Sequence, residues 1–227
     1  MKKAVFFDLD GTLTDPALGI TNSILYALEK MGLGQPPREE LYCFIGPPLL
    51  SAFQEYFGMT KEQAEEAIVR YREYFSVKGL LENAPYKGVD TMLAALKDAG
   101  YALFVATSKP EQFAVQILEH FGLAQYFDRI CGASMDASRN TKTAVLEYLL
   151  SETGAVSASA ADGAGDSAIT VIAMVGDRHH DIEGAKNVGI PSVGVLWGYG
   201  SAEELQAAGA DYTASSMEHL VEILCSL

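Results

Sequence analysis

The chain has 227 residues, of which 49% are hydrophobic, and a formal net charge of −14. This length allows one sizeable core, or a core domain with a smaller second domain. The acidic excess argues against nucleic acid and against an anionic membrane surface as partners, because contacts with phosphate groups need Lys and Arg. A small phosphate ester remains compatible with it, since a bound cation can reverse the local field.

The cysteines and the hydropathy pattern favour a cytoplasmic protein. Cys43, Cys131 and Cys225 have no paired spacing, which argues for a reducing compartment and against a disulfide framework or a zinc site. No stretch reaches 18 apolar residues, so no membrane-spanning segment is expected. These features are compatible with a monomer or a small homo-oligomer.

The predicted elements change in character twice along the chain. The apolar run at residues 4–7 predicts a buried parallel strand over residues 4–8, whereas residues 17–82 have only helical spacing of apolar residues. Strands then alternate with helices, which predicts βαβ units and a parallel sheet. We expect a doubly wound, Rossmann-like α/β core from residues 1–16 and 83–227, with residues 17–82 as an inserted all-helical cap. The later strands are predicted at 102–106, 129–131, 169–175 and 192–196, and the helices near 89–99, 111–121, 142–151 and 181–188.

Two kinds of connecting segment stand out. Proline at Asp15-Pro16 and at Asn83-Ala84-Pro85 restricts the preceding residue, so these sites are candidate hinges of the cap. Residues 152–167 are rich in Ala, Gly and Ser and are predicted to form a surface loop. Their role is left open.

The most informative motif is Asp8-Leu9-Asp10-Gly11-Thr12, which directly follows the apolar run and starts at the end of the first predicted strand. Two carboxylates at a strand end can serve one substrate in different roles, since Gly11, which follows them, lets the chain turn away. Carboxylates repel phosphate, so a hard cation between them and an anionic substrate would explain the pair. An Asp side chain can also act as a nucleophile and form an aspartyl-phosphate. An Asp-Gly hairpin turn is the plain structural alternative, but no matching strand follows it.

This motif resembles the first motif of the haloacid dehalogenase superfamily of phosphohydrolases, and later segments fit the family in order. The resemblance implies that Asp8 is the nucleophile and Asp10 the general acid and base. It also implies an Mg²⁺ ion held by Asp8, by the carbonyl group of Asp10 and by a later acidic residue. The segments from Gly189-Ile190-Pro191 to Trp197-Gly198-Tyr199-Gly200 are most similar to phosphoglycolate-phosphatase-like and 5′-nucleotidase-like members.

Thr107-Ser108-Lys109-Pro110 follows a predicted strand and is expected to open a helix, where hydroxyls and free N–H groups can bind an anion. Taken alone, the segment fits a simple helix cap better. The resemblance reverses this preference, because Thr107 matches the phosphate-binding hydroxyl of the family and Ser108 its usual neighbour. Lys142 starts a predicted helix, where a cation is locally unfavourable. The resemblance implies that Lys142 balances the charge of the phosphoryl group, although a solvated lysine is the plain alternative.

Gly176-Asp177-Arg178-His179-His180-Asp181 follows the longest apolar strand. It resembles the acidic metal motif of the family, which implies that Asp177 binds Mg²⁺ and that Asp181 acts through water or orients Lys142. His179 and His180 suggest zinc, but no third His or Cys is near in sequence. Their role is left open.

The loop Ile45-Gly46-Pro47 in the cap is either a plain turn between helices or a loop that closes over the site and contacts the leaving group. Taken together, the motifs and the family that they resemble imply a phosphoric monoester hydrolase, an Mg²⁺-dependent phosphatase that acts on a small phosphorylated metabolite, phosphoglycolate-like or nucleotide-like. Three alternatives stay open: a phosphosugar mutase with the same residues, a dehalogenase without Mg²⁺, against which Asp10 and Asp177 argue, and a non-catalytic regulatory relative.

Overall fold

A seven-stranded sheet forms the centre of the computed structural model, which describes residues 2–136, 138–157 and 169–227. The strand order is β5-β4-β1-β7-β8-β9, with β6 added beside β7, and every pairing in this sheet is parallel. The chain thus moves from β1 to one side of the sheet and later to the other, which is the predicted doubly wound arrangement. The strands are β1 (Lys2–Phe7), β4 (Ala102–Pro110), β5 (Arg129–Ala133), β6 (Val156–Ser157), β7 (Ile169–Gly176), β8 (Ser192–Val195) and β9 (Tyr212–Ala214).

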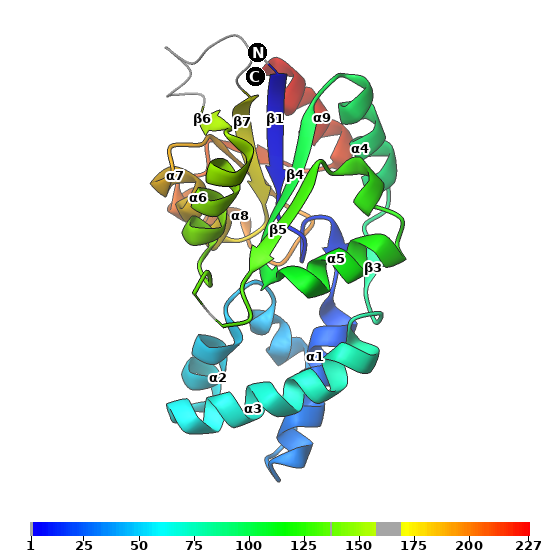
Figure 1. Ribbon diagram of the computed structural model, residues 1–227. Coiled ribbons are helices and arrows are strands. Elements are labelled where there is room, and N and C mark those ends of the chain that lie inside the picture. Colours follow the sequence, from blue (N-terminus) through cyan, green and yellow to red (C-terminus); the bar gives the residue numbers. More distant parts are fainter. Residues whose placement is uncertain (1, 137, 158–168) are drawn as a thin grey trace.

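Helices cover both faces of the sheet (Figure 1). The first layer is α4 (Val89–Asp98), α5 (Glu111–His120) and α9 (Met217–Ser226); the second is α6 (Lys142–Thr153) and α7 (His179–Asn187), with α8 (Ala202–Ala208) beside α7. In β1, Val5 and Phe7 belong to the core cluster of the first layer, whereas Ala4 and Phe6 belong to that of the second. Because both faces are buried, this strand is apolar throughout and does not alternate.

An all-helical insertion separates β1 from β4. Two short strands, β2 (Thr14–Asp15) and β3 (Ala84–Pro85), pair antiparallel and bring both ends of the insertion together at the two predicted hinges. Figure 1 shows the inserted helices beyond the carboxyl ends of the central strands. This arrangement fits a cap; its motion remains a prediction. The insertion contains α1 (Ala17–Lys30), the 3₁₀ helix η1 (Arg38–Phe44), α2 (Leu49–Phe57), α3 (Lys61–Tyr74) and the π-helix η2 (Phe75–Gly79).

Several boundaries differ from those predicted. Strand β4 runs on to Pro110 because, after an irregularity, Pro110 pairs with Ala133 of β5. Residues 156–157 form strand β6 inside the predicted loop 152–167, whose residues 158–168 lie outside the described part of the chain. None of the described helices is both long and apolar enough to cross a membrane.

Candidate active site

Three buried carboxylates meet at the carboxyl end of the sheet. Asp8 directly follows β1 and Asp177 directly follows β7, and the Asp8 N–H donates to the Val175 carbonyl oxygen at 2.9 Å. Asp181 lies in the first turn of α7. One carboxylate oxygen of each Asp lies within 4.8 Å of those of the other two. The motifs at both strand ends therefore converge as predicted, because neighbouring parallel strands end at the same edge.

Two glycine-containing turns enclose Asp177. Gly11 has φ +83°, and a Cβ atom there would lie 2.2 Å from Asp177 Oδ2; a Cβ atom at Gly198 would lie 2.3 Å from Asp177 Cβ. The close approach lets the Tyr199 N–H donate to Asp177 Oδ2 at 2.8 Å, while Thr12 Oγ1 donates to Oδ1 at 3.3 Å. The turn at Gly198, whose role the sequence did not reveal, thus holds Asp177 in place.

Lys142 is the first residue of α6, and only 5% of it is exposed. Its Nζ lies 2.9 Å from Asp8 Oδ1 and 2.7 Å from Asp181 Oδ1, and donates to the Ala106 carbonyl oxygen at 2.8 Å. A cation in the first turn opposes the helix dipole. Two carboxylates on the same ammonium compensate for this, so Lys142 is a buried, ion-paired lysine and not a solvated one. Its contact with Asp181 suits the orienting role predicted for that residue.

The pKa values of the buried groups are shifted in the directions expected for an excess of negative charge. Burial raises the pKa of Asp177 well above its usual value, and Asp181 and Asp8 raise it further. Burial also raises the pKa of Asp181, although Lys142 opposes the shift. Burial lowers the pKa of Lys142, but Asp181 and Asp8 together outweigh it and the net shift is upward. One ammonium therefore compensates only part of the charge of three carboxylates.

The donor set fits a hard divalent cation. All three clustered groups are carboxylates, and oxygen ligands are those that Mg²⁺ prefers. Nearby, the buried Oδ1 of Asp10 has no hydrogen-bond partner among the described residues. A divalent cation would compensate the remaining charge, so Asp8 and Asp177 suit the metal roles that the sequence predicted for them.

Asp10 is held by a lysine that we did not predict as a site residue. Lys109 Nζ lies 2.5 Å from Asp10 Oδ2 and 4.9 Å from the centre of the Phe75 ring, which belongs to the insertion. Burial raises the pKa of Asp10, and Lys109 opposes the shift. The signal in the sequence was a cation immediately after the hydroxyl pair Thr107-Ser108.

The two predicted phosphate-binding hydroxyls lie at the same cavity as Asp8 and Asp10. Thr107 is buried and its Oγ1 accepts from the Lys109 N–H at 3.2 Å, whereas Ser108 is half-buried. Neither caps a helix, because α5 starts after Pro110 and has no side-chain cap. The expectation that this segment opens a helix was wrong, since β4 continues through it.

The cavity has a volume of about 440 Å³ and lies between the core and the insertion. Gly46 and Pro47 line it, but the fully buried side chain of Ile45 does not. Arg178 Nη1, next to Asp177, donates to the Ile45 carbonyl oxygen at 2.5 Å and so joins this loop to the core. Apolar side chains form much of the wall, among them Leu49, Leu50, Ile68, Tyr71, Phe75 and Phe113.

On the general-acid role that the family resemblance implies for Asp10, replacing Lys109 with Met should lower kcat by about 10²-fold for alkyl phosphates, whose leaving groups need a proton. The physical reason is that Asp10 loses the ammonium that positions its carboxyl group. Aryl phosphates with good leaving groups should lose much less. The measurement is kcat for both ester types, with Lys97→Met as the control, because Lys97 pairs with Asp128 outside the cavity. An equal loss for both ester types would contradict a role through Asp10.

Known proteins are similar to this chain in sequence and in fold. The model of the family described as haloacid dehalogenase-like hydrolase matches residues 5–195. A 5′-nucleotidase of Pseudomonas aeruginosa is 39% identical over 220 residues, 97% of this chain and 94% of that protein. The tyrosine-protein kinase PtkA of Mycobacterium tuberculosis is 40% identical over 222 residues, 97% of this chain and 72% of that protein. The crystal structure of a predicted phosphatase from Clostridium acetobutylicum has a TM-score of 0.91 and 44% identity, with both chains fully covered.

The chain therefore belongs to the haloacid dehalogenase-like hydrolases, since the family model covers most of it. The predicted family, the doubly wound fold and the hydrolytic enzyme class are confirmed. The names of the relatives differ in the reaction and substrate that they state, so the substrate has to be argued from the cavity.

Proposed function

We propose that this protein is an Mg²⁺-dependent phosphatase that hydrolyses a small phosphomonoester through an aspartyl-phosphate at Asp8. The observation that carries the proposal is the placement of the buried Asp8 carboxylate, 2.9 Å from the Lys142 ammonium, at a cavity that Asp10 also lines. A nucleophile and a proton donor thus line one cavity, and a compensating cation contacts the nucleophile. This is the set of groups that phosphoryl transfer to a carboxylate needs.

In the first step, the Asp8 carboxylate attacks phosphorus and the bond to the leaving oxygen breaks. Asp10 donates its proton to that oxygen, and its raised pKa favours the protonated form that this role requires. In the second step, Asp10 takes a proton from a water molecule that attacks phosphorus. The bond between phosphorus and the Asp8 oxygen breaks, and phosphate leaves.

The remaining side chains bind and orient the phosphoryl group. Thr107 and Ser108 would donate hydrogen bonds to its oxygens, and Lys142 would compensate part of its charge. Asp181 keeps the ammonium of Lys142 in place at 2.7 Å. Mg²⁺, when held by Asp8, the Asp10 carbonyl group and Asp177, would neutralise further phosphoryl charge.

The cavity favours a nucleotide-like leaving group over a phosphoglycolate-like one. A two-carbon acid would fill only a small part of about 440 Å³ and would leave the apolar wall in contact with water. A nucleoside would cover aromatic side chains such as Tyr71 and Phe75 of the insertion. The 5′-nucleotidase relative is consistent with this preference.

The test is phosphate release from nucleoside 5′-monophosphates, phosphoglycolate and a sugar phosphate, with Mg²⁺ and with excess chelator. We expect release that needs Mg²⁺, with the largest kcat/KM for the nucleotides. Full activity in excess chelator would contradict the metal requirement. Isomerisation of the sugar phosphate without release would indicate a mutase, and transfer of phosphate from ATP to protein tyrosine would indicate an activity like that named for PtkA.

A larger side chain in the cavity wall should narrow the cavity and change the order of substrates ranked by kcat/KM. Ile68→Trp places a bulky ring where α3 lines the cavity, so kcat/KM for nucleotides should fall about tenfold or more. A small aryl phosphate should be nearly unaffected, since it occupies only the end near Asp8. Leu18→Trp is the control, because Leu18 is exposed on α1 and does not line the cavity. A uniform fall across all esters would mean that Ile68 supports the fold of the insertion and does not read the substrate.

A further inference from the structure

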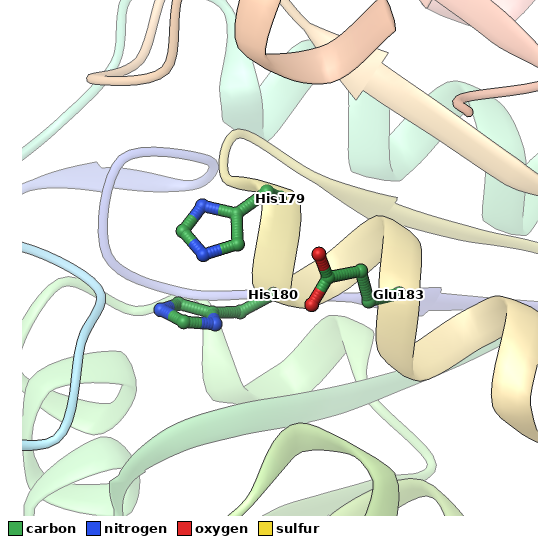
Figure 2. Close-up of side chains that lie close together, drawn as sticks. All are labelled: His179, His180 and Glu183. Carbon is green, nitrogen blue, oxygen red and sulfur yellow. The ribbon is translucent and has the colours of Figure 1, made fainter. Parts of the chain in front are cut away.

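The first turns of α7 carry three side chains that could bind a metal ion and that have no role in the proposed phosphatase mechanism. His179, His180 and Glu183 each offer one ligand atom, and these atoms lie within 4.8 Å of one another. Figure 2 shows the two imidazole rings one above the other, with the Glu183 carboxylate beside them. The ring centres are 3.8 Å apart. Both histidines are half-buried and Glu183 is exposed, so an ion could enter from solvent.

A fourth residue fixes one of these ligands from behind. Glu204 Oε1 lies 2.7 Å from His179 Nδ1 and also accepts from the His179 N–H and from Arg178 Nε, both at 2.9 Å. A carboxylate can only accept, so the ring proton belongs on Nδ1 and the lone pair on Nε2. Metal-binding histidines in proteins are usually held in this way, with a carboxylate on the nitrogen that does not bind the ion. This contact is independent of the clustering of the three ligands.

We propose that His179, His180 and Glu183 bind one divalent transition-metal ion, of the class of Ni²⁺ or Zn²⁺, at a site separate from that proposed for Mg²⁺. Imidazole nitrogen suits such ions, whereas Mg²⁺ prefers oxygen ligands. His179 and Glu183 are four residues apart and therefore share one face of the helix. Three protein ligands leave further positions for water.

Two carboxylates, Glu183 and Glu204, offset the positive charge that surrounds the cluster of His179, His180 and Glu183. The start of α7 and the neighbouring Arg178 guanidinium oppose a cation. Glu183 would bind the ion directly, and Glu204 contributes a second negative charge through His179. Asp181, which is buried and paired with Lys142, belongs to the catalytic group. The two sites therefore share helix α7 but no side chain.

The test is calorimetric titration of the full-length chain with Ni²⁺ in saturating Mg²⁺, which occupies the oxygen site. We expect one Ni²⁺ ion to bind. His179→Asn and His180→Asn should each weaken binding by about tenfold or more, and Glu204→Gln by roughly 10–100-fold. His219→Asn is the matched control, because His219 is an exposed histidine near Ser215 and should leave binding unchanged.

A measurement on the unsubstituted chain keeps the proposal testable even if a variant folds poorly. The chain has four histidines. Paramagnetic Ni²⁺ should broaden the imidazole signals of His179 and His180 and spare those of His120 and His219. No Ni²⁺ binding in saturating Mg²⁺, equal binding by the wild type and the His180 variant, or broadening centred on His120 or His219 would each overturn the proposal. Neither readout uses phosphate release, so its failure is distinct from a failure of the proposed phosphatase function.

Discussion

Replacing Asp8 with Asn should lower phosphatase turnover by on the order of 10⁴-fold or more, as loss of a nucleophile does in other enzymes. The Asn amide cannot attack phosphorus, and the neighbouring carboxylates are held by other groups. Asp177 accepts from the Tyr199 N–H and from Thr12. Asp181 is paired with Lys142, and Asp10 with Lys109. The measurement is phosphate release under single-turnover conditions. Asp90→Asn, an exposed carboxylate in the first turn of α4, is the control. Retention of more than a few per cent of wild-type turnover would show that Asp8 is not the nucleophile.

The same variant should keep the fold, and its response to metal should separate the two roles of Asp8. Without metal, Asn at this position has two opposite effects. It breaks the ion pair to Lys142, which lowers Tm, and it removes one of three clustered negative charges, which raises Tm. The fall in Tm should therefore be no larger than the loss of one ion pair would cause. Added Mg²⁺ should raise Tm of the wild type more than Tm of the variant, because ligands that bind only the native state stabilise it. An equal rise in both proteins would mean that Asp8 does not hold the metal.

The positions of Asp8, Asp177 and Lys142 could be anticipated because they depend on regular elements. Asp8 and Asp177 directly follow neighbouring parallel strands, and Lys142 starts a helix. Because strands and helices alternate along the chain, these three side chains are expected to lie at the same edge of the sheet. Buried apolar runs are long enough to reveal such strands. The roles proposed for these residues come from the family motifs that they match.

The contributions of Lys109 and Gly198 could not be anticipated in this way. Lys109 reaches Asp10 because β4 continues past Ala106 through an irregularity in its pairing with β5, and a single sequence carries no signal for this. Gly198 matters because Asp177 approaches its backbone, which depends on the packing of the loop after β8. Both contacts join residues far apart in the chain.

The loop Ile45-Gly46-Pro47 illustrates a similar limit. A place at the active site was one of the two alternatives left open for it, and the direction of each side chain was not predicted. Ile45 belongs to the hydrophobic core cluster, while Gly46 and Pro47 face the cavity. In a short loop the side-chain directions follow the local backbone and have no fixed period. A specificity test is therefore better placed on Ile68 than on Ile45.

Replacing Lys142 with Met should abolish phosphatase activity and also destabilise the metal-free protein, by about 3–5 kcal/mol as expected when one partner of a buried ion pair is removed. The loss leaves Asp8 and Asp181 without their shared ammonium at 2.9 and 2.7 Å. The measurement is chemical denaturation without metal. Lys97→Met, at an ion pair with a third of the lysine side chain exposed, should cost no more than about 1 kcal/mol.

The destabilisation by Lys142→Met should depend on pH with a definite sign. Burial already raises the folded-state pKa of Asp177 and Asp181, and losing the ammonium can only raise the pKa of Asp181 further. A carboxyl group whose pKa is raised on folding binds its proton more tightly in the native state. Its protonated form thus stabilises the fold at low pH, and this contribution is lost as pH rises above the unfolded value of about 3.9 through the folded value. The variant should therefore lose more stability relative to wild type at pH 8 than at pH 5.

Adding Asp8→Asn to the Lys142→Met variant should restore part of the lost stability, because it removes one of the carboxylates that the lysine balanced. In the wild-type background the same substitution breaks an ion pair, so the two changes should not be additive, and a double-mutant cycle measures the difference. Asp90→Asn in the Lys142→Met background is the matched control, since Asp90 is exposed and is not one of the clustered carboxylates. Additive losses in the cycle, together with a pH-independent loss for Lys142→Met, would mean that the ammonium does not compensate the buried carboxylates.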